Sequence, residues 1–418
     1  MAGDDDAVLE VCFVGAGVSN MYLAYRLLRE RRILKYAILE KSKRVGGRVH
    51  SSTWNNVVLE RGAGIARDRD RLLLALIKEL KVDNVVLDKH TALRVRAEAL
   101  PPMDGDAEIL RKWRLLAESA SAMDAAKRAR TTFRQLGVEI LGRAEFDKLV
   151  AGTGYTDYLD ADAIDTLFNY GVQDLVGGGS IVRVRWQQLL DRLYDFVGGL
   201  HIFTQCAVSK ITASAGNTYV LDTPRGPVRC RHLVLGVPSS AAQRLLKLPV
   251  YGQVRAQPFA RVYALIDPAK SKEFVEAVGA HAVVPSPLGK IIKIAGNLYM
   301  IAYCDNENAE FVRKNVCATK TQKERVTYLS KLIKYCTGKH AHVVDATMFY
   351  WKEGTHYFLP LQEGFRSREA FLEAARNPGR QRLFVVGEAF SNNQGWVEGA
   401  LESAEAVLPK LRASLFSK

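Results

Sequence analysis

The apolar residues at the start of the chain change their spacing in a defined order. Residues 8–14 are almost continuously apolar, as expected of a strand buried on both faces, and residues 15–20 supply a turn that contains glycines. Over residues 21–29 the apolar positions recur at helical spacing, and a second short apolar run at 33–39 precedes an acidic residue. The pattern predicts a strand, a glycine turn, a helix and a second strand in succession.

The middle of the chain predicts two further kinds of structure. An amphipathic helix is expected at 70–80, and a charged, helix-rich insertion with little strand character at 106–149. Between residues 199 and 237 the period shifts to two, and a Gly-Asn hairpin turn falls at 216–217. We expect a small antiparallel sheet from the strand-like runs at 201–204, 208–213, 218–223 and 232–235.

The last part of the chain alternates strands and helices. A helix at about 322–335 and a final strand and helix, at 383–387 and 396–411, follow three more strand-like runs at 260–266, 290–294 and 299–303. The final strand and helix would return to the first domain. The whole pattern predicts an α/β fold, in which a second α+β domain has a mixed sheet flanked by helices.

The length and composition fit two packed domains. The chain has 418 residues, of which 48% are hydrophobic and 25% are charged, a composition typical of globular proteins. A chain of this length is too long to fold around one ordinary core. No apolar run approaches the roughly 20 residues of a membrane span. Neither a basic leader nor a cleavage pattern precedes the first strand. We therefore expect a soluble intracellular protein, located in the cytoplasm.

The charge and the cysteines add little chemistry. The formal net charge is +14, but the lysines and arginines are spread along the chain, which favours a basic, well-solvated surface over a nucleic-acid partner. No two cysteines have the short spacing of a zinc or dithiol site. We expect no metal site and reduced, mostly structural thiols at Cys12, Cys206, Cys230, Cys304, Cys317 and Cys336.

The glycine turn has the chemistry of a Rossmann-type dinucleotide-binding unit. Gly15 permits the tight bend, and Gly17 lets the backbone approach a pyrophosphate at the start of the helix, beside Ser19. Asn20 stands where a third glycine is usual. Glu40, at the end of the second strand, can accept hydrogen bonds from both ribose hydroxyls. A carboxylate there disfavours a 2′-phosphate, so we predict an adenine dinucleotide other than NADP.

Two more segments suit a flavin dinucleotide. After Lys41, the pair Gly46-Gly47 would let the backbone approach the cofactor, and Arg48 would offer a guanidinium to a phosphate or to the flavin. Near the C-terminus, Glu388 follows a buried strand, and the helix that begins near Trp396 would turn its N-terminus toward the flavin pyrimidine.

Together these segments resemble the flavin-containing amine oxidase superfamily, which includes the monoamine oxidases and the L-amino-acid oxidases. Residues 40–48 look like its GG motif, residues 59–64 resemble the continuation along the flavin, and residues 385–400 are similar to the C-terminal FAD signature. Val208 matches the strand by which family members hold the adenine through backbone groups. The resemblance also implies FAD contacts by Gly62, Ala63, Gly64, Gly387, Gly395, Val397 and Ala400.

The resemblance covers nearly the whole chain and implies its domain organisation. A discontinuous FAD-binding domain would comprise residues 1–85, 182–248 and 378–418. The substrate domain would comprise residues 86–181 and 249–377, with 106–149 helical. In such oxidoreductases a hydride passes from the carbon bearing a neutral amine to flavin N5, the imine is hydrolysed, and O2 reoxidises the flavin to give hydrogen peroxide.

Four residues are implied on the substrate side. Trp396 occupies the family position of an aromatic wall beside the flavin, and His356 or Tyr357 would supply the facing wall. Two such rings would guide an amine by cation–π attraction and exclude water. Arg261 stands where family members often have a lysine that is water-bridged to flavin N5. Arginine stays charged and is bulkier, so oxygen activation is in doubt and anion binding becomes an option.

Two further departures concern the substrate carboxylate and the cofactor link. Amino-acid oxidases of the family present an arginine where this chain has Ile65, and Arg67, Arg69 or Arg261 could replace it. No cysteine falls next to Tyr357, where covalently flavinylated members carry their thioether link. We therefore expect noncovalent FAD.

The departures at Asn20, Ile65 and Arg261 keep a second interpretation open, namely a flavin-binding protein with little catalysis and a structural or regulatory role. A third, an anion- or nucleic-acid-binding accessory protein, rests on the net charge alone. The expected partners are a small-molecule amine or amino acid and O2, without a membrane or nucleic acid. The substrate and the oligomeric state, a homodimer included, stay open.

Overall fold

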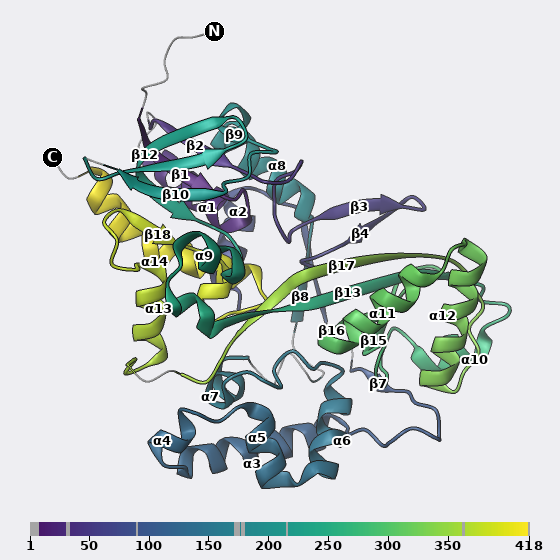
Figure 1. The fold of residues 1–418 in the computed structure, drawn as a ribbon. Coiled ribbons are helices and arrows are strands. Elements are labelled where there is room, and N and C mark those ends of the chain that lie inside the picture. The colour runs from purple at the N-terminus through teal and green to yellow at the C-terminus, as the bar shows by residue number, and fades with distance from the viewer. Residues whose placement is uncertain are drawn as a thin grey trace. The chain divides into compact units, whose positions relative to one another are not determined.

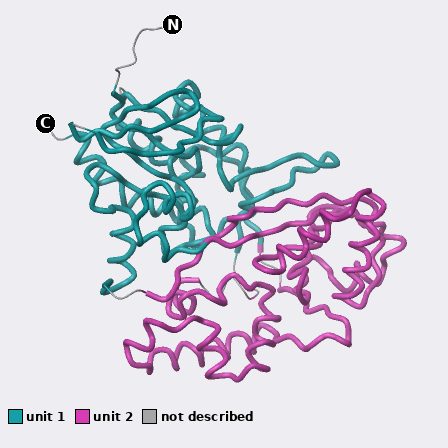
Figure 2. Tube along the Cα trace, viewed as in Figure 1, with its two compact units in different colours: residues 1–87, 180–255, 363–418 teal, residues 88–179, 256–362 magenta. Residues whose placement is uncertain are grey.

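The computed structural model describes residues 8–30, 34–88, 91–170, 176, 180–214, 216–361 and 364–416 (Figure 1). Residues 1–7, where no leader was expected, and residue 33, the predicted start of the second strand, lie outside this set. The chain divides into two units, and each is built from segments far apart in the sequence (Figure 2). Unit 1 comprises residues 1–87, 180–255 and 363–418, and unit 2 comprises residues 88–179 and 256–362.

Unit 1 is organised around the predicted strand, turn, helix and strand. Strand β1 (Leu9–Val14) runs parallel to β2 (Tyr36–Leu39), and helix α1 (Val18–Glu30) connects them. All four residues of β2 are buried. The continuous apolar runs are therefore explained, because both faces of these strands are covered. The strand order in this seven-stranded sheet is β10-β11-β12-β1-β2-β9, and β18 pairs with β12.

The predicted separate antiparallel sheet is wrong in one respect. The strands β10 (Lys210–Ser214), β11 (Thr218–Thr223) and β12 (Gly226–Leu235) do form antiparallel hairpins. However, β12 continues past the hairpin and pairs in parallel with β1, so all three strands belong to the main sheet. The run at 201–204 is the short strand β9 (Ile202–Phe203), which pairs in parallel with β2.

Helices cover the unit 1 sheet and close its core. Helix α14 (Val397–Phe416) packs against α1 and α2 (Arg71–Glu79), and α8 (Trp186–Val197) also packs against α1. Strand β18 (Leu383–Val385) continues the sheet beside β12, which confirms the predicted return of the C-terminal strand and helix.

The remaining elements of unit 1 are short. Strands β5, β8 and β6 form a three-stranded sheet, and β3 pairs with β4 as a hairpin. Helix α13 packs against β18, η4 and η5, which explains why the last segment of unit 1 begins before this helix. The bounds are β3 Ser51–Trp54, β4 Val57–Glu60, β5 Ala66–Arg67, β6 Asn84–Asp88, β8 Ser180–Val184, η3 Gly199–His201, α9 Ser239–Leu246, η4 Pro249–Gln253, α13 Arg368–Arg376 and η5 Glu388–Phe390.

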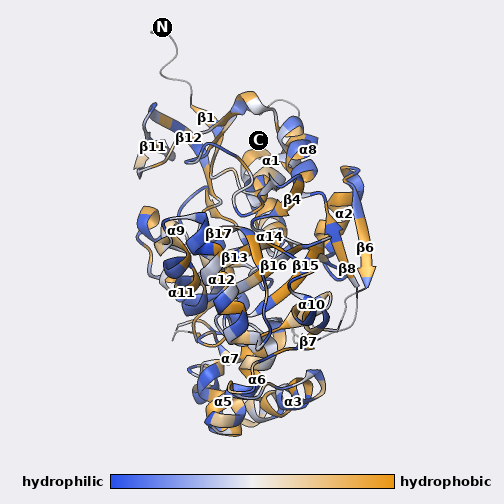
Figure 3. Cartoon of the chain, turned by 90° about the vertical axis from the view of Figure 1, so that its right-hand side faces the viewer, coloured by the Kyte–Doolittle hydropathy of each residue, from blue (hydrophilic) through white to orange (hydrophobic). Residues whose placement is uncertain are grey.

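Unit 2 combines a six-stranded mixed sheet with two groups of helices. The strand order is β17-β13-β16-β15-β14-β7; β13 and β16, β16 and β15, and β15 and β14 pair antiparallel, whereas β14 and β7 pair in parallel. Strands β15 and β16 are coloured mainly as hydrophobic in Figure 3, in line with the buried core that they share with helices α10 to α12. The bounds are β7 Leu93–Arg94, β13 Val254–Ile266, α10 Lys272–Val278, β14 His281–Val283, β15 Lys290–Ala295, β16 Leu298–Asp305, α11 Asn306–Ala318, α12 Gln322–Thr337 and β17 Val343–Phe358.

The predicted helical insertion is confirmed as a cluster with its own core. Trp113, Phe133, Phe146 and Tyr158 pack together in it. Lys112 is almost fully buried, and its Nζ lies 2.7 Å from Asp104 Oδ2 and 2.8 Å from Glu145 Oε2. The helices are α3 Asp106–Ala122, α4 Ala125–Arg128, α5 Phe133–Leu141, α6 Arg143–Thr153, α7 Ala163–Asp165 and the π-helix η1 Thr166–Tyr170.

The predicted α/β class with a second α+β unit is therefore confirmed, while strand β17 and helix α8 were not predicted. Within the described residues, none of the helices combines the length and the apolar character that crossing a bilayer requires. The six cysteines are free thiols, and five of them are buried.

Candidate functional site

The glycine turn and Glu40 form a connected structure at the carboxyl end of β1 and β2. Ala16 N–H donates to Glu40 Oε2 at 2.8 Å, and Ser42 N–H donates to Glu40 Oε1 at 2.8 Å. Gly15 has φ +95°, and a Cβ there would lie 2.5 Å from the carbonyl oxygen of Gly236. Glycine is required at position 15 for both reasons, because an L side chain disfavours this φ and the backbone leaves no room.

The Asn20 side chain stabilises the glycine turn through hydrogen bonds to its backbone. Its Nδ2 donates to the carbonyls of Val14 at 3.0 Å and of Gly15 at 2.8 Å, and the side chain is fully buried. A Cβ on Gly236 would come within 2.6 Å of the Asn20 amide. The space that a third glycine would leave in α1 is therefore filled by Asn20, and a glycine is needed instead at Gly236, at the end of β12.

The GG segment lies directly beside the glycine turn. Gly46 N–H donates to the carbonyl of Ala16 at 2.8 Å. Gly46 and Gly47 have φ +96° and +59°, and a Cβ on Gly47 would sit 3.4 Å from the Cα of Gly17. A Cβ on Gly17 itself would meet nothing within 4 Å. The two glycine segments together leave the backbone open at the start of α1, as close approach of a pyrophosphate requires.

Arg48 connects the GG segment to the two other predicted cofactor segments. Its backbone carbonyl accepts from Ala63 N–H at 3.1 Å, and a Cβ on Gly62 would lie only 1.7 Å from this carbonyl oxygen. Its guanidinium pairs with Glu388 Oε2 at 2.7 Å, while Gly395 N–H donates to Glu388 Oε1 at 3.1 Å. Residues that are far apart in the sequence are thus joined around one ion pair.

The start of α14 is held by one further side chain. Glu398 is buried, and its carboxylate accepts from Leu72 N–H at 2.9 Å and Leu73 N–H at 2.8 Å, the first turn of α2. Burial raises the pKa of this carboxyl, and the two N–H donors oppose the rise. One carboxylate therefore ties the starts of two helices together.

Trp396 stacks on an arginine. The Arg67 Cζ lies 4.0 Å from the centroid of the Trp396 ring. Arg67 is buried, pairs with the buried Asp70 at 2.6 Å, and donates to Asn393 Oδ1 at 2.9 Å. This geometry restrains the ring and places a positive charge on one of its faces. Arg67, one of the three arginines predicted as candidates for a substrate carboxylate, is therefore already paired with a carboxylate of the protein.

The electrostatics of the cradle favour an anion. We use "cradle" for residues 15–17, 40–48, 62–64 and 387–395. Desolvation, together with Arg44 and Arg61, lowers the pKa of His50 to about 4, so this imidazole is neutral at pH 7. Arg44 itself donates to the carbonyl of Gly47 at 2.8 Å. Because Arg44 and Arg61 make a further positive charge at His50 unfavourable, this part of the cradle favours a negatively charged group such as a pyrophosphate.

Val208 offers the remaining contact expected of an adenine site. Gln205 N–H and Cys206 N–H donate to the carbonyls of Ser42 and Glu40 at 2.9 and 2.8 Å, which brings this loop beside Glu40. In the described part of the chain, the N–H and C=O of Val208 have no hydrogen-bond partner. The open backbone at Gly17, the donor set and Val208 thus fit an adenine dinucleotide. Of the other predicted contacts, Ser19 is buried, Lys41 is exposed, and Gly64, Gly387, Val397 and Ala400 are partly exposed.

The other three predicted catalytic residues belong to unit 2. Arg261 is buried on β13 opposite Tyr303, and its Cζ lies 4.9 Å from the Tyr303 ring and 5.5 Å from the Phe259 ring. Desolvation acts to lower its pKa, but nearby tyrosine hydroxyls outweigh this, and the net pKa of Arg261 is raised. His356 is buried and Tyr357 is half-buried, both near the end of β17.

A polar cluster around the buried Asp305 in unit 2 was missed by the sequence analysis. Tyr170 donates to Asp157 Oδ1 at 2.7 Å, and Asp305 accepts from the N–H groups of Thr156 and Asp157 at 3.1 Å. Burial and the neighbouring Asp305 raise the pKa of Asp157 to about 7. These residues come from separate segments, and no local pattern marks them as neighbours. An acidic residue in a strand-rich apolar region is the one available signal.

Comparison with known proteins agrees with the cradle. A family model described as flavin containing amine oxidoreductase matches residues 21–407. Cyclohexylamine oxidase from Brevibacterium oxydans IH-35A has a similar fold, with a TM-score of 0.76 and 17% identity over 97% of this chain and 100% of that chain. A putrescine oxidase bound to putrescine gives a TM-score of 0.72 and 16% identity, over 97% of this chain and 99% of that chain.

One relative in sequence is itself a protein without an assigned activity. An uncharacterized protein of Acanthamoeba polyphaga mimivirus is 21% identical over 96% of this chain and 93% of its own length. At these identities the solved structures establish the fold. Because the family model spans most of the sequence, the chain belongs to the flavin-containing amine oxidoreductase family.

Proposed function

We propose that this chain binds FAD noncovalently in unit 1 and oxidises a primary or secondary amine or an amino acid to an imine, with O2 reduced to hydrogen peroxide. The observation that carries the proposal is that the three predicted cofactor-binding segments are connected by hydrogen bonds and an ion pair. Gly46 N–H donates to the carbonyl of Ala16, and Arg48 pairs with Glu388. This arrangement brings the glycine turn, the GG segment and the C-terminal segment into one cradle, and family membership supports a flavin there.

When bound, FAD would supply the hydride acceptor and pass the electrons on to O2. The residues that would hold it are those of the cradle, with Glu40 at the ribose, the backbone of Val208 at the adenine, and the open backbone near Gly17 at the pyrophosphate. Glu40 already accepts two N–H groups, so its carboxylate is oriented before a ribose hydroxyl arrives. This pre-orientation lowers the entropy cost of binding.

On the substrate side, the chain's own residues would orient and select. Arg67 occupies one face of Trp396, so attraction of a protonated amine to this ring is reduced. A ring used in this way acts mainly as a wall that excludes water and favours the neutral amine, which is the form that can lose a hydride. Arg67, Arg69 and Arg261 are the candidates for a substrate carboxylate, and Arg67 would have to share its guanidinium with Asp70.

The visible spectrum of the purified protein tests this proposal. We expect flavin absorption bands that trichloroacetic acid releases into the supernatant, since no covalent link is expected. Under anaerobic conditions the bands should bleach with one pool of amines or L-amino acids, and they should return with peroxide release when air is admitted. Protein without flavin bands would contradict the FAD assignment.

A second candidate is an FAD-binding protein with little catalysis. It is favoured by Arg261, a buried arginine held by the Phe259 and Tyr303 rings at the position where family members often have a lysine. The two candidates separate with Arg261→Lys. If the native protein never bleaches but the variant does, Arg261 has silenced oxidation. Bleaching of the native protein by any amine removes this second candidate.

A further inference from the structure

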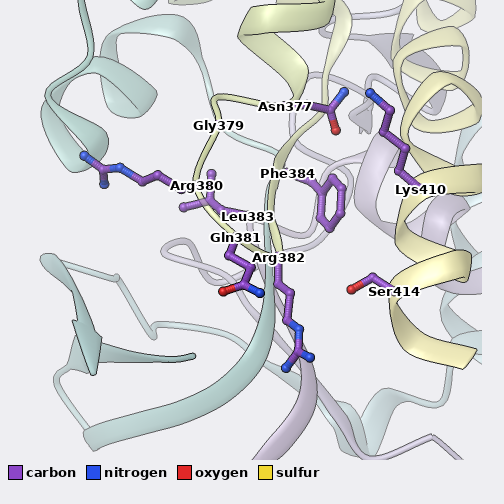
Figure 4. Close-up of a pocket in the computed structure, with 9 residues that line it drawn as sticks. All are labelled: Asn377, Gly379, Arg380, Gln381, Arg382, Leu383, Phe384, Lys410 and Ser414. Atoms are coloured by element: carbon purple, nitrogen blue, oxygen red, sulfur yellow. The ribbon is translucent and has the colours of Figure 1, made fainter. Parts of the chain in front are cut away.

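A hollow of about 400 Å³ lies in unit 1 (Figure 4). The loop after α13 and the start of β18 form one wall, and the last turns of α14 form the other. Strands β18, β12 and β1 are parallel. The loop precedes β18 and therefore lies at the amino ends of these strands, whereas the glycine turn follows the carboxyl end of β1. The lining residues are Asn377, Gly379, Arg380, Gln381, Arg382, Leu383, Phe384, Lys410 and Ser414.

The loop contains a strained turn that carries an arginine. Leu383 N–H donates to the carbonyl of Arg380 at 3.2 Å and closes the turn. Arg382 has φ +61°, a conformation for which turns prefer glycine or asparagine. Neighbouring groups hold the turn in place, because Tyr219 donates its hydroxyl to the carbonyl of Gln381 at 2.6 Å and Leu233 N–H donates to the carbonyl of Arg382 at 2.9 Å. Strain that the surroundings maintain in this way often marks a functional site.

The hollow also carries an excess of positive charge. Across the residues that the structure describes, no carboxylate pairs with Arg380 or Arg382, and Arg380 donates only to the carbonyl of Leu246, at 3.0 Å. Lys410 is paired with Glu373. Arg382 lies close enough to His232 to add to the desolvation that lowers the pKa of this histidine. The two arginines therefore leave the loop with two uncompensated charges.

The side chains around the hollow differ in direction. Figure 4 shows the Phe384 ring between the loop and α14, with Lys410 near Asn377 and with Arg380 extending away from α14. Ser414 Oγ lies 2.8 Å from His232 Nε2, so this hydroxyl is held at the edge of the hollow. The Arg382 guanidinium and the Ser414 hydroxyl thus lie on one side of the Phe384 ring, while the Lys410 ammonium and the Asn377 amide, which both contact Glu373, lie on the other.

We propose that this hollow binds the phosphate groups of a small molecule that carries two or more phosphates. Guanidinium forks match phosphate oxygens in pairs, and the side-chain amides add neutral donors. The volume falls within the range of small-molecule sites. A nucleic acid needs a longer track of basic residues, and the hollow is bounded by α14. The site is separate from the cradle and does not depend on the proposed amine oxidation.

The test uses the full-length, FAD-loaded protein, with sodium tripolyphosphate as the probe in isothermal titration calorimetry at low salt. We expect one tripolyphosphate per chain. Arg382→Gly should weaken binding at least tenfold, while the turn is retained because glycine favours φ +61°. The matched control is Lys81→Gly, since Lys81 is an exposed cation with φ +53° in the same unit but outside the hollow.

Three results would overturn the assignment. Equal weakening by both substitutions would mean that tripolyphosphate senses only the overall charge. Undetectable binding to the native protein, in samples whose flavin spectrum and melting curve are normal, would mean that there is no site. A single-stranded oligonucleotide that binds more tightly than tripolyphosphate, with a steeper dependence on salt, would assign the hollow to nucleic acid instead.

Discussion

The cradle of unit 1 and the polar cluster of unit 2 are built from different materials. In the cradle, main-chain N–H and C=O groups make most contacts, and glycines stand where a Cβ would meet backbone, as at Gly15 and Gly62. In unit 2, side chains take part in every contact described, with Arg261 beside the Phe259 and Tyr303 rings and Asp157 hydrogen-bonded to Tyr170. A site made of backbone constrains sequence at fixed positions, whereas a site made of side chains constrains only which groups meet in space.

This difference predicts how each region fails. Backbone sites should break when atoms are added, and side-chain sites should break when a charge loses its partner or a pKa is crossed. Four substitutions test that contrast, beginning with an exception inside unit 1.

Arg67→Met should have the largest effect on stability. It leaves the carboxylate of Asp70, which has 0% side-chain exposure, buried without its cation. Breaking such a pair costs about 3–5 kcal/mol, measurable by urea unfolding of the flavin-loaded protein. The control is Arg143→Met, whose ion pair with Asp147 is exposed and should be worth less than about 1 kcal/mol. Equal losses of unfolding free energy in the two variants would show that the buried Arg67–Asp70 pair contributes no more to stability than an exposed ion pair.

Gly62→Ala should cost about 3 kcal/mol and release FAD. The added methyl would lie 1.7 Å from the carbonyl oxygen of Arg48, so the backbone on one side must move. Gly252→Ala is the matched control in the same unit, because nothing lies within 4 Å of its added methyl. Thermal melts and flavin retention on a desalting column give both readouts. A Gly62→Ala protein that keeps its FAD and its melting temperature would contradict a backbone-built cradle.

Asp157→Asn should change how stability depends on pH. The carboxyl is protonated up to about pH 7 in the folded chain, whereas its ordinary pKa is 3.8. Between these values the folded state binds more protons than the unfolded state, so raising the pH from 5 to 8 destabilises the native protein. We expect the variant to lose this contribution, roughly 2 kcal/mol, when melting is followed across that range. Asp160→Asn, at an exposed site, should leave the slope unchanged.

Gly17→Ala should have the smallest effect on folding and a selective effect on the cofactor. No atom of the protein lies within 4 Å of the added methyl, so the melting temperature of the FAD-free protein should not change. FAD affinity should fall about tenfold, or about 1.4 kcal/mol, because the methyl enters the space for the pyrophosphate. Fluorescence titration with FAD measures this. Unchanged affinity would move the pyrophosphate away from the glycine turn.

The sequence predicts the cradle better than the rest of the molecule for a physical reason. A tight turn or a close backbone approach requires a glycine at a fixed spacing from a strand. This spacing can be recognised within a short stretch of sequence. Gly15, Gly46 and Gly62 can therefore be recognised from the order of residues alone. Strand β17 and the cluster at Asp157 cannot, since they depend on pairing between distant segments that no local period records.

The error in the predicted small sheet has a related origin. Alternation at 218–235 correctly indicates hairpins, but β12 is longer than the hairpin and passes into the parallel sheet. Only the buried second half of β12, which is apolar on both faces, carries that information. The stacking of Arg67 on Trp396 is also absent from any local pattern, because the two residues are brought together by the docking of α14.

The contact between Asn20 and Gly236 has an evolutionary consequence. The Asn20 amide fills the volume that any side chain at position 236 would need. It also donates to the carbonyls of Val14 and Gly15, which a glycine at position 20 could not do. Asn20→Gly alone would leave a gap, and Gly236→Ala alone would create a clash. The two positions are therefore epistatic, and a lineage that changes one of them must pass through a less stable intermediate before the other can follow.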